Sequence, residues 1–186
     1  MNDANYVVCP TNNGKKGMCP YYLRWRDMLR RCYSNKCQQR YPTYRGCEVD
    51  ERWHSFMTFR AWMIEQPWQG QHLDKDFVGN GKEYSPESCR FISAELNKLF
   101  NDHGNARGDL PQGVRRLGSG YLARLSINGK LISKYFRTIQ AASDWYLEKK
   151  TQYVESLYPS LDADLVRGCK TGLAFIRYPT LKALCQ

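Results

Sequence analysis

The strongest constraint on folding in this chain is the dipeptide Asn128-Gly129 within the stretch GYLARLSINGKLISKYF. Asn-Gly is the preferred pair for a two-residue hairpin turn, because both central residues must adopt a positive φ. Such a turn fixes the register of the strands that it joins. The sequence therefore predicts an antiparallel hairpin in which Ile127 pairs with Lys130, Leu125 with Ile132, Ala123 with Lys134 and Tyr121 with Phe136.

This register gives the hairpin two different faces. The face with Ala123 and Leu125 is mostly apolar, whereas the other face carries Leu122, Arg124, Ser126, Leu131, Ser133 and Tyr135. Thr138 is a suitable N-cap for a helix with the sequence IQAASDWYLEKKTQYVESL. Five of its side chains are expected to cover the apolar face: Ile139, Ala142, Trp145, Tyr146 and Tyr153. The polar face then stays open, and its Arg124, Ser126, Ser133 and Tyr135 suit a DNA major groove.

The segment LPQGVRRLGSGYLARLSINGKLISKYFRTIQAASDWYLEK resembles the APETALA2-type DNA-binding domain, over residues 110 to about 158. The shared pattern is Gly-Val-Arg, a Tyr-x-Ala-x-Leu strand, the Asn-Gly turn and Phe-x-Thr before an Ala-rich helix. The resemblance implies three strands laid in the DNA groove with a helix behind them. Tyr121 stands where that family usually has a tryptophan, so the bases read stay open. The candidate DNA-binding residues are Arg115, Arg116, Arg124, Ser126, Ser133 and Tyr135.

Charge also favours a nucleic-acid partner. The net charge is +10, and a strong basic excess suits polyanions. Residues 1–66 carry 11 basic and 6 acidic side chains, residues 67–105 carry 4 and 6, and residues 106–186 carry 13 and 6. An acidic centre between basic flanks suits a nuclease that holds a divalent cation against DNA. The alternative is that the basic excess serves solubility only.

Two helices are predicted in the N-terminal part. In YYLRWRDMLRRCY, from residue 21, the residues Trp25, Met28, Leu29 and Cys32 follow a helical period and are expected to face a core. Asp50 is expected to cap a second helix, ERWHSFMTFRAWMIEQ, and the stretch QQRYPTYRG between the helices is turn-like. The arginines off the first stripe form either a solvated face or a phosphate-contacting one: Arg24, Arg26, Arg30 and Arg31.

The central stretch HLDKDFVGNGKEYSPESCRFISAELN, residues 72–97, combines acidic residues with a glycine-rich turn. LDKD resembles the Asp-His-x-Asp strand of the HNH endonuclease motif, and YSPESCRFISAELN resembles its Pro-Glu-Asn-Leu-Arg-Trp-Val…Asn segment. The resemblance implies a β-β-α site in which Asp74 and Asn97 hold Mg²⁺ or another divalent cation. Lys75 stands at the position of the general-base histidine, and Ser88 at that of the asparagine that orients it.

This replacement bears on activity because phosphodiester hydrolysis needs a base that accepts a proton near neutral pH. An ordinary lysine is protonated there, and neighbouring carboxylates favour its charged form further. Asp76 or His72 are the alternative bases. By strand alternation, Asp76 and His72 share one face with Asp74, while Lys75 points to the other face. The catalytic candidates are therefore Asp76, Lys75 and His72, and we expect cleavage to be weakened or lost.

The sequence has eight cysteines, and no two of them are spaced as C-x-x-C. Buried free thiols are therefore the favoured interpretation. The alternative is a structural Zn²⁺ held by Cys19, Cys32, Cys37 and Cys47. The sequence lacks a membrane-spanning run and a signal-peptide pattern at its start, which favours a cytoplasmic protein without a membrane partner.

The resulting prediction is an α+β protein with three parts. Residues 1–105 form a helical region that contains the degenerate β-β-α motif at 72–100. Residues 106–158 form a three-stranded antiparallel sheet on one helix, and residues 159–186 an extension that packs on the body. This order most resembles small phage-encoded HNH homing endonuclease-like proteins. The alternatives are a non-catalytic DNA-binding regulator or phage factor that acts against a host system, and a protein that binds RNA or a host protein.

Overall fold

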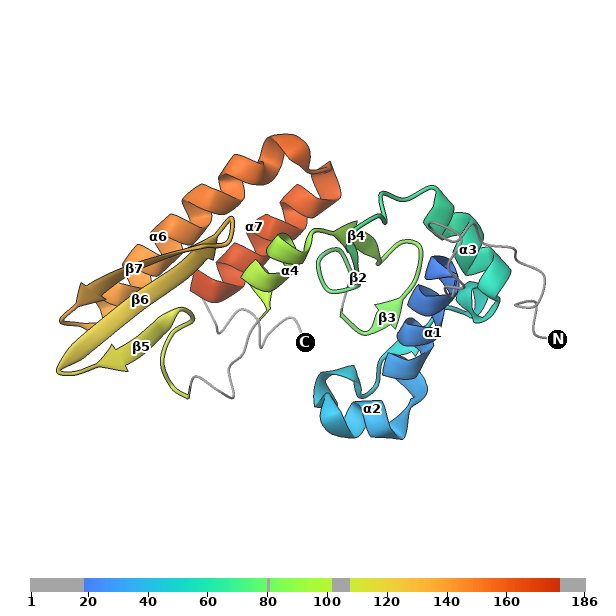
Figure 1. The fold of residues 1–186 in the computed structure, drawn as a ribbon, viewed down its shortest axis with the longest axis horizontal. Helices are drawn as coiled ribbons and strands as arrows, with labels where there is room; N and C mark the ends of the chain where they lie inside the picture. Colours follow the sequence, from blue (N-terminus) through green and yellow to red (C-terminus); the bar gives the residue numbers. More distant parts are fainter. Residues whose placement is uncertain (1–18, 80, 102–107, 178–186) are drawn as a thin grey trace. The chain divides into compact units, whose positions relative to one another are not determined.

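The computed structural model describes residues 19–79, 81–101 and 108–177. The chain divides into two compact units, Met1–Asn97 and Lys98–Gln186 (Figure 1). This division falls inside a helix, α4 (Ala94–Phe100), eight residues before the boundary expected at residue 105. The polar segment that suggested the later boundary lies partly outside the described residues, at 102–107.

The described part of the first unit is helical at its start, as expected. Helix α1 (Pro20–Tyr33) buries Trp25, Met28 and Cys32, with Leu29 packed beside them. Its arginines lie off this stripe. The predicted turn region instead contains a short helix α2 (Asn35–Arg40), capped by Ser34, and a 3₁₀ turn η3 (Pro42–Tyr44). Pro42 does end α2, because proline cannot continue a helix.

The second predicted helix is wrong as a single element. Asp50 caps a 3₁₀ turn, η4 (Glu51–His54), by accepting a hydrogen bond from the Arg52 amide. The backbone is extended at Ser55, and helix α3 (Phe56–Ile64) begins after it. At the break, the carbonyl of Trp53 accepts a hydrogen bond from the Trp25 indole nitrogen at 2.7 Å. This tertiary bond satisfies a carbonyl that a continuous helix would have used for its own ladder.

The break explains how so many aromatic side chains in this region reach one core. Trp53 and Phe59 are fully buried and meet edge to face at 5.1 Å. Trp62 packs on both of them and stacks on Phe91 at 5.8 Å. The change of direction at Ser55 therefore places residues before and after it on the same core, which one helical stripe does not allow.

Two small sheets complete the first unit. Strand β1 (Glu48–Val49) pairs in parallel with β3 (Glu83–Tyr84). Strand β2 (His72–Asp74) pairs antiparallel with β4 (Arg90–Ile92), and α4 follows β4 directly. The β2–β4–α4 sequence is the β-β-α arrangement expected for this segment (Figure 1).

The second unit contains the predicted three-stranded antiparallel sheet. Its order is β5 (Val114–Leu117), β6 (Gly120–Ile127) and β7 (Lys130–Phe136). The four cross-strand pairs predicted from Asn128-Gly129 are all confirmed. Both turn residues have positive φ, 49° at Asn128 and 74° at Gly129. Local turn chemistry thus fixes the register of this sheet.

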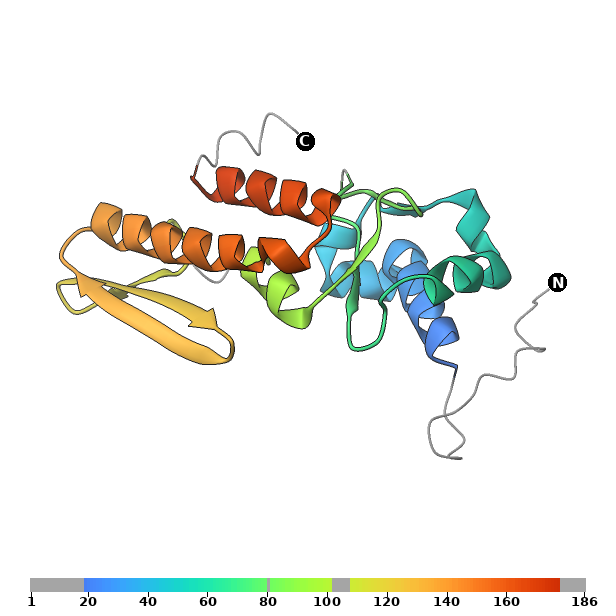
Figure 2. The same cartoon turned by 90° about the horizontal axis from the view of Figure 1, so that it is seen from above.

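Helix α6 (Ile139–Leu157) covers one face of the sheet with the bounds expected from sequence, and the Thr138 hydroxyl accepts from the Ala141 amide. Ala142, Tyr146 and Tyr153 are buried as predicted, whereas Ile139 is 36% exposed. Helix α7 (Ala163–Arg177) packs on α6, so that α6 lies between the sheet and α7 (Figure 2). The expected packing of residues 159–186 is described to residue 177; residues 178–186 lie outside the described part.

Within the stretches described here, none of the helices is long and apolar enough to cross a membrane.

Candidate nucleic-acid interface and metal centre

The sheet face away from α6 is exposed and carries most of the predicted DNA-binding side chains. Strand pairing places Arg115, Leu122 and Tyr135 in one row across the three strands. Arg124 and Ser133 form the next row, and Ser126 and Leu131 the one after it. Arg124, Ser133 and Tyr135 are exposed, and Ser126 is half-buried. We call the six side chains Arg115, Leu122, Arg124, Ser126, Ser133 and Tyr135 the open sheet face.

Arg116 differs from the other predicted DNA-binding residues. It pairs with Tyr121, one position along β5 from Arg115, and therefore points to the opposite side of the sheet. Its guanidinium lies over the Tyr121 ring, 5.4 Å from the centroid. Arg115 and Arg116 were both predicted to bind DNA, but strand alternation places them on opposite faces of the sheet.

Tyr135 is an exposed aromatic side chain whose position is fixed by a glycine. A Cβ at Gly120 would lie 2.4 Å from the Tyr135 hydroxyl oxygen, so the ring lies directly against this glycine. The hydroxyl is also 3.5 Å from Ser119 Oγ. Although Tyr135 is 47% exposed, close packing on Gly120 holds it in one orientation on the open sheet face.

In the central segment, Lys75 is buried and bound. Its Nζ donates to Asp76 Oδ1 at 2.6 Å and to the Gly81 carbonyl at 2.5 Å, and it lies 5.5 Å from the centre of the Tyr84 ring. Burial acts to lower the pKa of Lys75, but the Asp76 carboxylate outweighs it, and the pKa is raised above its ordinary value. The ammonium therefore stays protonated and cannot accept a proton.

The chain turns directly after Asp74. The expectation that the side chains of residues 74 to 76 alternate between two faces of a strand is therefore wrong. Asp74 Oδ1 accepts hydrogen bonds from the amides of Asp76 and Phe77 at 2.9 and 3.0 Å. Strand β2 ends at Asp74, and the Asp76 side chain turns to Lys75. Burial, and then the nearby Asp76 charge, raise the pKa of Asp74. A carboxylate that is poorly solvated in this way is one that a bound cation would stabilise.

His72, the first residue of β2, lies beside Asn97 of α4. Asn97 Nδ2 lies 3.2 Å from His72 Nδ1, although 25 positions separate them in the sequence. His72 and Asp74 lie on one side of β2, two residues apart. The structure thus pairs one predicted metal ligand, Asn97, with one predicted catalytic residue, His72.

Asp74, His72 and Asn97 could supply only some of the ligands that a cation such as Mg²⁺ needs. The part of the chain that the structure covers contains no group of three or more His, Cys, Asp or Glu side chains suited to a metal. Mg²⁺ commonly binds through one or two carboxylates together with water and substrate phosphates. Asp74, with the neighbouring His72 and Asn97, is compatible with that mode, in which water and a bound phosphate group would supply the remaining oxygens.

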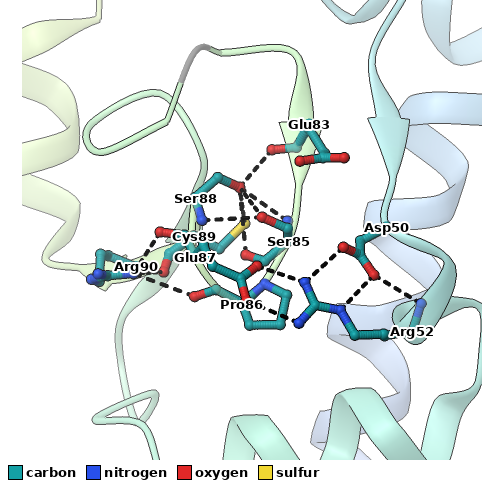
Figure 3. Close-up of polar contacts among 9 residues, drawn as sticks. All are labelled: Asp50, Arg52, Glu83, Ser85, Pro86, Glu87, Ser88, Cys89 and Arg90. Atoms are coloured by element: carbon teal, nitrogen blue, oxygen red, sulfur yellow. Dashed lines mark hydrogen bonds and ion pairs between the residues drawn. The ribbon is translucent and has the colours of Figure 1, made fainter.

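The Ser-Pro-Glu-Ser-Cys turn after β3 is held by its two serines (Figure 3). Ser88 Oγ accepts from the Ser85 amide at 3.0 Å and donates to the Glu83 carbonyl at 2.7 Å. The Ser88 amide in turn donates to Ser85 Oγ at 3.1 Å. Gly79 packs on this turn so closely that a Cβ there would lie 2.6 Å from Ser88 Cβ. Ser88 therefore has a role in the turn itself.

An exposed ion-pair group joins this turn to η4 (Figure 3). Arg52 contacts Asp50 at 2.7 Å and Glu87 at 2.6 Å. Hydrogen bonds from Arg52 lower the pKa of Asp50 to about 2 and also lower the pKa of Glu87. Glu87 thus has a structural partner, which sequence reasoning did not identify because 35 residues separate the two.

The four arginines of α1 differ in their roles. Arg24 donates to the Gln71 carbonyl, and Arg31 is bonded to the buried Tyr84 hydroxyl at 3.4 Å. Arg26 and Arg30 both lie close to Asp27, at 3.7 and 3.5 Å. None of the four is therefore a free cation. Tyr84 contacts both Arg31 and Lys75, a role that no sequence pattern indicated.

The candidate zinc cysteines include two buried free thiols, Cys32 and Cys47, and the half-buried Cys37. Cys19 is disulfide-bonded, so its sulfur is not available as a thiolate. Burial raises the pKa of Cys32 to about 12, which disfavours the thiolate that zinc needs. The zinc site stays a prediction, with three free thiols instead of four.

Comparison of this chain with protein-family models, with curated protein sequences and with solved structures found no match.

Proposed function

We propose that this chain binds double-stranded DNA through the open sheet face, as a protein of the phage HNH homing endonuclease-like class. The single observation that carries the proposal is the position of Arg115 and Arg124. Both project from the face that α6 leaves uncovered, beside exposed hydroxyl and aromatic side chains. Arginine is the commonest side chain to read guanine in the major groove, and a β-sheet can enter that groove.

The chemistry of the central segment supports weakened cleavage. A divalent cation at Asp74 would polarise the scissile phosphate and stabilise the leaving oxygen. The side chain at the base position, Lys75, is a protonated ammonium held by Asp76 and Gly81. His72, whose ring nitrogen lies 3.2 Å from the Asn97 side chain, is the third catalytic candidate in this segment. DNA binding is therefore the main proposed function, and metal-dependent phosphodiester cleavage is secondary.

A second candidate function is a DNA-binding regulator or phage factor without catalysis. This candidate is favoured because the Lys75 ammonium is held by Asp76 and by the Gly81 carbonyl, so it cannot act as a general base. Strand scission with Mg²⁺ or Mn²⁺ selects the nuclease, and binding without scission selects the regulator. If duplex DNA is not bound, RNA or a host protein becomes the partner to test. We expect the protein to act in the cytoplasm of the host cell.

Adjacent arginines provide the matched test of the binding proposal. Arg115→Ala and Arg124→Ala should each weaken binding to a specific duplex by about 1–3 kcal/mol, measured by fluorescence anisotropy at fixed salt. Arg116→Ala removes the same charge from the opposite side of the sheet and should have a much smaller effect. Equal losses at Arg115 and Arg116, or binding that does not respond to salt, would contradict the proposal.

A further inference from the structure

A basic surface on the first unit has no assigned role. Residues 28–47 contain five basic side chains and no aspartate or glutamate. Two of the five, Arg30 and Arg31, have the partners described above. The others are exposed on α2 and on the turn after η3. We call the set Lys36, Arg40 and Arg45 the α2 basic surface.

These cations are not neutralised within the described residues. The side chains of Lys36 and Arg45 have neither an ion pair nor a hydrogen bond there, and the Arg40 guanidinium lies over the Tyr41 ring, 5.4 Å from its centroid. Asp27 is paired with Arg26 and Arg30, and Asp50 is paired with Arg52. Lys36 and Arg40 are also four residues apart on α2, where like charges repel and destabilise a helix.

The scaffold below this surface is well fixed. Ser34 caps α2 by accepting from the Cys37 amide, and the Gln38 side chain donates to the Cys32 carbonyl. Tyr41 meets Tyr44 edge to face at 6.4 Å, and Arg31 lies over Tyr44. A short helix that keeps repelling charges on a fixed support gains stability when a polyanion binds.

We infer that the α2 basic surface is a second DNA-binding surface, which contacts backbone phosphates of duplex DNA without reading bases. This inference rests on the proposed function, because it takes the partner of the open sheet face as its own. Arg40 lies over the Tyr41 ring, which stays 47% exposed. The three cations suit phosphate groups, and the test therefore compares duplex with single-stranded DNA.

The test compares two triple variants of the full-length chain that remove the same charge. One is Lys36→Gln/Arg40→Gln/Arg45→Gln; the control is Arg167→Gln/Lys170→Gln/Arg177→Gln on α7. Affinity for a duplex of arbitrary sequence is measured against salt concentration. Each phosphate contact contributes about 0.9 to the slope of log affinity against log salt, so three contacts predict a slope shallower by about 2.7. The α7 control should keep most of the wild-type slope.

The outcomes separate this inference from the proposed function. If both triple variants lose the same slope, only net charge matters and the α2 surface is not a binding site. If the α2 variant binds the duplex as wild type does while Arg124→Ala weakens it, the open sheet face stands and the inference fails. If the α2 variant is weakened and Arg124→Ala is not, the inference stands and the sheet proposal fails. Loss of binding to single-stranded DNA alone, or no duplex binding by wild type, overturns the inference.

Discussion

The Lys75 ammonium lies 2.6 Å from the carboxylate of Asp76, and the lysine side chain is only 5% exposed. Two of the three catalytic candidates therefore neutralise each other. The Asp76 carboxylate keeps the lysine protonated, and the lysine holds one oxygen of the carboxylate that was the alternative base. This contact disfavours a general base at either position and leaves His72 as the third catalytic candidate.

Restoring the ordinary base should therefore restore cleavage. Wild type is expected to show weak or no Mg²⁺-dependent scission of plasmid DNA, and Lys75→His/Ser88→Asn should raise it by about 10²–10⁴-fold. Asp74→Ala in that background should abolish the gain. Ser88→Asn alone is the folding control, because Ser88 Oγ holds the turn after β3. Efficient cleavage by wild type that Asp76→Ala stops would show that Asp76 is the base.

Asp74→Asn should stabilise the protein at neutral pH without divalent cations. A folded-state pKa that is raised contributes stability below the unfolded value and loses it as pH rises. The asparagine oxygen can still accept from the Asp76 and Phe77 amides. Thermal melts should therefore show the variant above wild type at pH 7, with the gap closing below about pH 4. Mg²⁺ should raise the melting temperature of wild type only; an equal effect on both proteins would speak against Asp74 as a ligand.

The ion pairs of Arg52 with Asp50 and Glu87 should stabilise the fold at neutral pH and lose this contribution in acid. This pH dependence is opposite to that expected for Asp74. Depressed carboxyl pKa values contribute stability above their unfolded values and lose it as pH falls through the folded ones. The difference in unfolding free energy between wild type and Arg52→Gln should be constant near neutral pH and shrink between about pH 4.5 and pH 2. Arg45→Gln removes an exposed arginine that lacks an ion pair within the described residues, and its difference should not change over this range.

Lys150→Met should destabilise the second unit. The Lys150 side chain is fully buried, and its Nζ donates to the Leu99 carbonyl at the end of α4 and to Gln112 Oε1. Methionine fills a similar volume but leaves these acceptors without that donor, which costs about 1–3 kcal/mol. Denaturant unfolding measures the loss. Lys149→Met, at the adjacent and more exposed position, should stay within about 0.5 kcal/mol of wild type; similar losses at both positions would refute a specific role for Lys150.

The sequence by itself determined the elements whose cause is local. Asn128-Gly129 set the turn and, through it, every pair between β6 and β7. Thr138 set the start of α6, and the spacing of Trp25, Met28 and Cys32 set the buried stripe of α1. In each case neighbouring residues in the chain supply the deciding interaction, so the pattern can be read without the rest of the molecule.

The tertiary structure decided what depends on partners far away in the sequence. Tertiary packing splits the predicted helix at Ser55, where the Trp25 indole N–H donates a hydrogen bond to the Trp53 carbonyl. Only packing could bring Asn97 to His72 and Lys150 to the end of α4, because these contacts span 25 and 51 positions. A buried donor or acceptor must find a partner, but the sequence does not record which one lies within hydrogen-bonding distance. That distance is set by the folded chain.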